Sequence, residues 1–108
     1  MRRAESYQEF WPLYLAEHRR PATRALHFLG TSLGLLLLVF GLITLTWWLI
    51  PVALVAGYGF AWLGHAFIER NRPATFTHPL WSLISDFRMF GLWLSGRLGR
   101  ELRKAGRP

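Results

Sequence analysis

The chain has 108 residues, enough for one domain, with 52% hydrophobic residues, 18% charged residues and a formal net charge of +7. The charges are segregated, because residues 25–68 contain no Asp, Glu, Lys or Arg and all 13 basic residues lie outside that stretch, whereas an average soluble domain mixes roughly a quarter charged residues throughout. Basic residues that flank apolar segments are typical of membrane proteins and argue against nucleic-acid binding, and the absence of cysteine excludes a disulfide framework and thiolate chemistry.

The first predicted element is a helix over residues 7–19. Its aromatic residues and His18 recur at helical spacing, which predicts a short amphipathic helix lying in the membrane interface with the aromatic face toward the lipid. The helix should end near Arg19 and Arg20, because Pro21 disfavours helical conformation in the residue before it. The N-terminal sequence lacks a short apolar run with a cleavage site, so it is not interpreted as a signal peptide.

Two membrane-spanning helices follow, over residues 21–44 and 47–70. A bilayer core is about 30 Å thick and needs roughly 20 apolar residues per helix, so the uncharged stretch supplies two crossings and a tight turn. Trp47 and Trp48 mark the far interface, where indole rings are favoured. Two crossings return the chain to its starting side, and the basic residues at both ends predict that both termini are cytoplasmic and lie near anionic lipid head groups.

A third segment, residues 79–98, carries apolar residues on one broad face and Asp86 and Arg88 in its middle. It is predicted to be an amphipathic or partly embedded helix rather than a third crossing. Residues 99–108 form a basic tail that is expected to fray. The predicted fold is therefore a single all-α domain over 1–108, an integral membrane helical hairpin with one shorter helix on each side.

The hairpin brings two histidines together. A turn centred near residue 46 places His27 and His65 at the same depth, one to two helical turns inside the basic boundary. A chain reversal at Pro21 would fold the first helix back and carry His18 to the same point. Three converging imidazoles predict a transition-metal site, and iron, zinc, copper and nickel all accept such ligands.

Other interpretations of these residues stay open at this point. Each histidine is also compatible with an interfacial hydrogen-bonding role, and His78, before Pro79, is either a helix cap or a fourth member of the site. Glu69 lies four residues after His65 and so on the same helix face, although it is also compatible with a simple charge cluster at the interface. Two facing histidines would equally suit axial ligation of haem in an electron carrier, and a non-enzymatic lipid-binding or partner-binding module needs no metal. The oligomeric state is open.

Three blocks of sequence resemble a known family. Residues 14–18 with 27–30 form a first block, residues 79–87 form a third, and the most specific block contains Gly64-His65, Glu69 and Pro73-Ala74. Over about residues 7–98 the chain resembles the membrane 2-hydroxy fatty acid dioxygenases of the fungal phytosphingosine-degradation type and their short bacterial relatives. The fungal members are longer, with additional membrane segments.

The resemblance implies an iron(II)-dependent reaction with O₂ that shortens a 2-hydroxy fatty acid by one carbon. It implies that His18, His27 and His65 are the essential histidines and that Glu69 is the acidic residue of the site. A 2-hydroxy acid can chelate iron through its carboxylate and hydroxyl while O₂ takes a remaining position. Arg24 or Arg72, and also Arg20, would steer the carboxylate, and Glu69 would orient a ligand imidazole or bind the metal itself.

Overall fold

The computed structural model describes residues 4–106, and every regular element in that range is a helix. In chain order these are α1 (Tyr7–Ala16), α2 (Pro21–Ile43), α3 (Leu49–Leu63), the π-helical turn η1 (Gly64–Glu69), the short 3₁₀ turn η2 (Ala74–Phe76), α4 (Pro79–Leu94) and α5 (Leu98–Ala105). The prediction of an all-α fold is confirmed.

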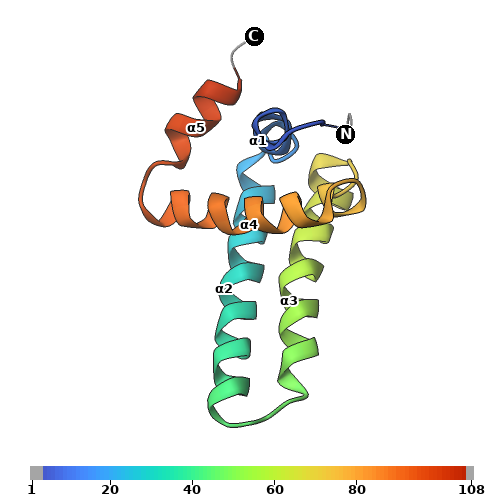
Figure 1. Cartoon of the computed structure of the whole chain (residues 1–108), viewed down its shortest axis with the longest axis vertical. Coiled ribbons are helices and arrows are strands. Elements are labelled where there is room, and N and C mark those ends of the chain that lie inside the picture. The colour runs from blue at the N-terminus through green and yellow to red at the C-terminus, as the bar shows by residue number, and fades with distance from the viewer. Residues whose placement is uncertain (1–3, 107–108) are drawn as a thin grey trace.

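An antiparallel pair, α2 and α3, forms the long axis of a molecule that measures 49 × 28 × 27 Å (Figure 1). Helix α4 lies across this pair, and α1 and α5 lie at the end away from the α2–α3 turn (Figure 1). Both ends of the described chain are therefore at the same end of the hairpin, as the sequence predicted.

Both arms of the hairpin have the length and composition of membrane helices. Pro21 occupies the first turn of α2, where its missing N–H costs nothing, and the helix contains 23 residues from Pro21 to Ile43. Helix α3 continues without a break into η1 to give 21 residues, Leu49–Glu69. At 1.5 Å per residue these arms are about 30–35 Å long, so each is long and apolar enough to cross a bilayer core.

Small residues set the distance between the two arms. A Cβ atom added to Gly30 would lie 2.9 Å from the carbonyl oxygen of Gly57, and one added to Gly34 would lie 3.0 Å from that of Ala53. The glycines thus permit the two backbones to touch, as small residues do in pairs of membrane helices. The close contact fixes the register of α2 against α3, and hence the positions of the residues at their upper ends.

Gly30→Ala is expected to lower the free energy of unfolding by about 1–3 kcal/mol, because the new methyl group forces the two backbones apart. Gly59→Ala is the matched control: a Cβ at Gly59 meets no atom within 4 Å, and alanine favours helix over glycine. Thermal unfolding in detergent compares the two variants. Equal stability of the two variants would contradict the proposed role of the Gly30–Gly57 contact.

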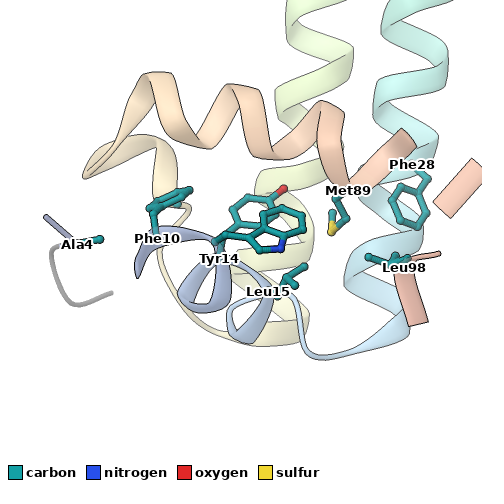
Figure 2. Packing of buried hydrophobic residues seen from close by; sticks show 9 residues of the cluster. Ala4, Phe10, Tyr14, Leu15, Phe28, Met89 and Leu98 are labelled. Carbon is teal, nitrogen blue, oxygen red and sulfur yellow. The ribbon is translucent and has the colours of Figure 1, made fainter. Parts of the chain in front are cut away.

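The buried core lies where α1, α4 and α5 meet the upper part of α2. Phe10, Tyr14 and Met89 are completely buried there, and Figure 2 shows Phe10 and Tyr14 between α1 and α4, with Met89 pointing from α4 into the same cluster. The sequence prediction turned the aromatic face of the first helix toward lipid, and this is wrong. That face packs against protein because α4 folds over it, and the rings of Tyr7 and Phe10 contact Trp81 of α4.

The C-terminal region also differs from the prediction. The expected helix over 79–98 ends at Leu94, and Gly96, with a φ of +74°, turns the chain into the separate helix α5. The expected frayed tail is therefore helical as far as Ala105, while residues 107–108 lie outside the described part. Helix α5 is held by a hydrogen bond from the Trp11 indole N–H to Oε1 of Glu101 (3.0 Å).

Candidate metal centre

Three histidines from three different elements meet in the interior. His18 lies just after α1, His27 is in the second turn of α2, and His65 is in η1, and all three side chains are buried. Their Nε2 atoms form a triangle with sides of 3.0 Å (His18–His27), 3.0 Å (His18–His65) and 3.3 Å (His27–His65). The structure thus brings together the three residues that the sequence predicted to converge, in an arrangement that could hold a metal ion.

The π-helical turn positions His65 and the residue that supports it. Helix α3 widens into η1 over Gly64–Glu69, and Arg70 ends it with a left-handed backbone (φ 61°, ψ 44°). The N–H of Asn71 then bonds back to the carbonyl oxygen of His65 (3.0 Å). Left-handed non-glycine residues and π turns cost energy and are frequent at functional sites, and here they bring Asn71 beside the His65 ring.

Hydrogen bonds fix the protonation of two of the rings. Nδ1 of His18 lies 2.6 Å from the carbonyl oxygen of Tyr14, so this nitrogen must be the N–H donor. Nδ1 of His65 lies 2.6 Å from Oδ1 of Asn71, and the amide is oriented by Nδ2, which donates to the backbone and side chain of Glu17. His65 therefore also carries its proton on Nδ1, because the atom facing it accepts.

The third ring, His27, has a carboxylate behind it. Its Nδ1 lies 3.6 Å from Oδ1 of Asp86, and this same oxygen accepts a hydrogen bond from the Tyr14 hydroxyl. Burial raises the pKa of Asp86 to about 7, while the Tyr14 hydrogen bond lowers it. Burial also raises the pKa of Tyr14 well above its usual value, so the phenol keeps its proton and remains the donor.

The arrangement leaves lone pairs facing each other. With both Nδ1 atoms protonated, Nε2 of His18 and Nε2 of His65 are unprotonated acceptors only 3.0 Å apart. Burial and the two neighbouring imidazoles lower the pKa of His18 well below its usual value, which disfavours a proton between them. Two buried acceptors at this distance repel unless a cation or a shared donor lies between them, and a metal ion bound to neutral imidazoles meets that need.

A carbonyl, an amide and a carboxylate are the partners that metal-bound histidines normally have; here the carbonyl and the amide fix the tautomers of His18 and His65, and the carboxyl group of Asp86 faces His27. Sequence reasoning had assigned this supporting role to Glu69. In the structure the Glu69 carboxylate accepts a hydrogen bond from the backbone N–H of Arg20 (2.6 Å). That contact joins the ends of η1 and α2 at the boundary of the site.

The other predicted site residues lie near the centre but do not enter it in this structure. Nη1 of Arg24 donates to the carbonyl oxygens of His18 (2.8 Å) and Arg19 (2.9 Å), so it holds the segment that carries the first histidine. Arg72 is exposed and directly follows Asn71. Their predicted role in binding a carboxylate stays a prediction.

His78 lies outside the cluster. It occupies the N-cap position of α4 without making a side-chain cap. Its Nε2 is instead 3.2 Å from both the N–H and the carbonyl oxygen of Ala4, and its ring stacks on Trp81 at 5.5 Å. The fourth histidine thus attaches the N-terminal segment to α4.

A comparison with protein-family models finds a match over residues 4–98, a range that includes the three histidines together with Asn71 and Asp86. The matching model is described as "Mpo1-like: 2-hydroxy-palmitic acid dioxygenase Mpo1-like". Neither a curated protein nor a solved structure matches the chain.

Proposed function

The chain belongs to the Mpo1-like 2-hydroxy-palmitic acid dioxygenase family, and on this basis we propose that it is an iron(II)-dependent dioxygenase that shortens 2-hydroxy fatty acids by one carbon. The observation that carries the proposal is the buried triangle of His18, His27 and His65, in which the Nε2 atoms converge and those of His18 and His65 are both acceptors. The family description supports a dioxygenase reaction on a 2-hydroxy acid, and the triangle could hold the ion that such a reaction needs.

The dimensions of the triangle fit a single divalent ion. At a metal–nitrogen distance of about 2.1 Å, ligands at right angles lie about 3.0 Å apart and tetrahedral ligands about 3.4 Å apart, and the observed distances of 3.0, 3.0 and 3.3 Å lie in this range. Three histidines would leave room on the ion for substrate and O₂, as in non-haem iron(II) oxygenases, although the usual triad of those enzymes has a carboxylate in place of one histidine.

Haem fits these distances less well. Two axial imidazoles, each about 2.0 Å from the iron, would hold their nitrogens about 4 Å apart on opposite sides of the porphyrin plane. The Nε2 atoms here are 3.0–3.3 Å apart and a third histidine adjoins both. A module without a metal would leave the acceptor nitrogens of His18 and His65 to share at most one donor, the Nε2–H of His27, so it is also disfavoured.

The electron balance of the reaction is closed without a reductant. Converting a 2-hydroxy acid into the acid one carbon shorter and carbon dioxide releases four electrons, and one O₂ takes up four electrons. The sum is one 2-hydroxy acid and one O₂ giving one shortened acid, one CO₂ and one water. When bound, iron(II) would supply the redox centre and the template for substrate and O₂.

Residues around the site would orient the three histidine rings and bind the head group of the substrate. The carbonyl of Tyr14 and the amide of Asn71 hold His18 and His65 in the tautomer that leaves Nε2 free for a metal, and Asp86 faces Nδ1 of His27 at 3.6 Å and would favour the same tautomer there. The substrate carboxylate would meet Arg72 or Arg20, which are exposed at this boundary, with Arg24 keeping His18 in place. Glu69, as the acidic residue of the site, would act through its contact with Arg20.

The proposal places the hairpin in a membrane. Only 22% and 28% of the most apolar 18-residue windows of its two arms are buried inside the protein, whereas a core helix of a soluble protein would be mostly buried. Exposed apolar surface of this extent needs a nonaqueous neighbour. The basic ends, which hold both termini, would then lie on the cytoplasmic side beside anionic lipid head groups, and the substrate would enter from the bilayer.

Turnover of 2-hydroxypalmitic acid tests the proposal directly. Protein purified anaerobically in detergent and supplied with iron(II) is expected to consume one O₂ and release one CO₂ for each molecule of the shortened acid, without an added reductant. Palmitic acid is the control, since it lacks the hydroxyl needed for chelation and should not react. Absence of O₂ uptake with 2-hydroxy acids of several chain lengths, or an intense haem band in the visible spectrum, would refute the assignment.

A further inference from the structure

A half-open groove runs along the hairpin on the side that α4 crosses. Its interior volume is about 140 Å³ and it is open along one side, so a ligand bound there would be only partly enclosed by the protein. It is lined by α2 and α3 along its length and by residues of α4 near its upper end. The lining is apolar except for His27, Thr31, Tyr58 and Asp86.

The polar residues connect the groove to the metal centre. His27, Tyr58 and Asp86 line both the groove and the small cavity beside the histidine triangle, so the two spaces share a wall. A ligand that occupied both would have its polar end at His27 and an apolar remainder directed along the hairpin. The shared residues His27 and Asp86, which belong to the metal centre, distinguish the groove from the other apolar surfaces of the two arms.

The far end of the groove lies near the α2–α3 turn. Gly34 approaches Ala53, and Gly41 approaches Leu49, so Leu38 and Ile50 lie between these two contacts at the end of the lining farthest from the histidines. Leu38 follows His27 by eleven positions along α2, which corresponds to about 16 Å along the helix axis. The groove is thus long and narrow, as a binding site for an unbranched alkyl chain should be.

We infer that this groove binds the alkyl chain of the 2-hydroxy acid and that Leu38 and Ile50 determine which chain lengths are accepted. The inference rests on the proposed function, because the occupant is the remainder of the molecule whose head group reacts at the histidines. The apolar lining excludes a second charged group at the far end. The open side of the groove faces the region that lipid would occupy, so the chain can enter laterally.

Changes at the far end should alter chain-length preference without affecting the chemistry. Leu38→Trp fills the end of the groove, and the double variant Leu38→Ala/Ile50→Ala enlarges it. Each methylene that loses its apolar contact weakens binding by about 0.8 kcal/mol, so displacing two methylenes should change the ratio of kcat/KM for long over short substrates by roughly tenfold. The ratio should fall for Leu38→Trp and rise for the double variant.

Val39→Trp is the matched control. Val39 is the next residue on the same helix, is 51% exposed and does not line the groove. It should leave the chain-length ratio unchanged. The inference is overturned if Leu38→Trp lowers kcat/KM equally for all lengths, or if Val39→Trp shifts the ratio as much as Leu38→Trp does.

Photolabelling separates failure of this inference from failure of the proposed function, because it needs no turnover. The probe is 2-hydroxypalmitic acid with a diazirine at the end of its alkyl chain. Wild-type protein is expected to be labelled near Leu38 and Ile50, in competition with unlabelled 2-hydroxypalmitic acid, and Leu38→Trp should move or abolish the label.

Each outcome of the labelling experiment is decisive. Labelling of outward-facing positions such as Val39, or competition by phospholipid as effective as that by the 2-hydroxy acid, would overturn the inference even if the enzyme is active. Specific labelling of the groove in a protein that oxidises no 2-hydroxy acid would support the groove as the chain site and refute the reaction assigned to it.

Discussion

Replacing His27 with alanine is expected to remove the metal from the protein and to lower kcat/KM for 2-hydroxypalmitic acid by at least about a thousandfold. His27 contributes one of the three converging nitrogens, and its Nδ1 faces the carboxyl group of Asp86 at 3.6 Å. Loss of one ligand from a three-histidine set leaves two imidazoles, too few to hold a divalent ion at micromolar concentration. Metal analysis of anaerobically purified protein, together with O₂ uptake, measures both effects.

His78→Ala provides the matched control for His27→Ala. Both histidines are buried, at 7% and 5% exposure, but the contacts of His78 are with Ala4 and Trp81. The His78 variant should unfold at a lower temperature and still bind about one metal ion per chain, because the three ligands stay in place. Full metal content in His27→Ala, or loss of metal in His78→Ala, would contradict the ligand assignment.

The convergence of the histidines could be predicted because it depends on features that a sequence displays. The length of the uncharged stretch and the position of the tight turn determine which residues of two antiparallel helices lie at equal depth. These two features predicted that His27 and His65 lie at the same depth. Pro21 marks the reversal that returns His18 to them. The structure brings all three together.

The environment of Glu69 could not be predicted in the same way. Its expected position beside His65 assumed α-helical spacing, in which residues four apart share a face. Over Gly64–Glu69 the chain is instead a π-helix, whose wider turn gives residues four apart different directions. The sequence of this segment does not indicate that it forms a π-helix. The Glu69 carboxylate therefore contacts the backbone N–H of Arg20 instead of His65.

Asn71 and Asp86 were missed as supports of the histidines, for different reasons. Asn71 reaches His65 only because Arg70 adopts a left-handed conformation, which residue type does not indicate. Asp86, by contrast, gave a signal: a lone carboxylate in the middle of a broad apolar helical face must find a partner when that face is buried. Its partners, Tyr14 and His27, lie far away in the sequence, so the helix packing had to be known to identify them.

Asp86→Asn is expected to weaken metal binding by about 10–100-fold, the usual effect of removing a partner behind a ligand histidine. The substitution keeps the size of the side chain but removes the carboxyl group that faces Nδ1 of His27 and, when ionised, favours a proton there. It also offers an amide N–H₂ that can turn toward the ring and reverse the tautomer. Competition with a chromophoric chelator measures the affinity, and kcat should fall with the occupancy of the site.

Glu101→Gln separates this effect from a general loss of acidic charge. Glu101 also accepts a hydrogen bond from an aromatic residue of α1, Trp11, but it lies on α5, outside the centre. Its substitution should weaken the contact of α5 with α1 and leave metal affinity unchanged. If Asp86→Asn binds metal as tightly as the wild type, the carboxylate serves only to join α1 and α4 through Tyr14. A selective loss in Asp86→Asn would mean that α4, the helix that crosses the hairpin, completes the metal centre formed by the three histidine-bearing segments.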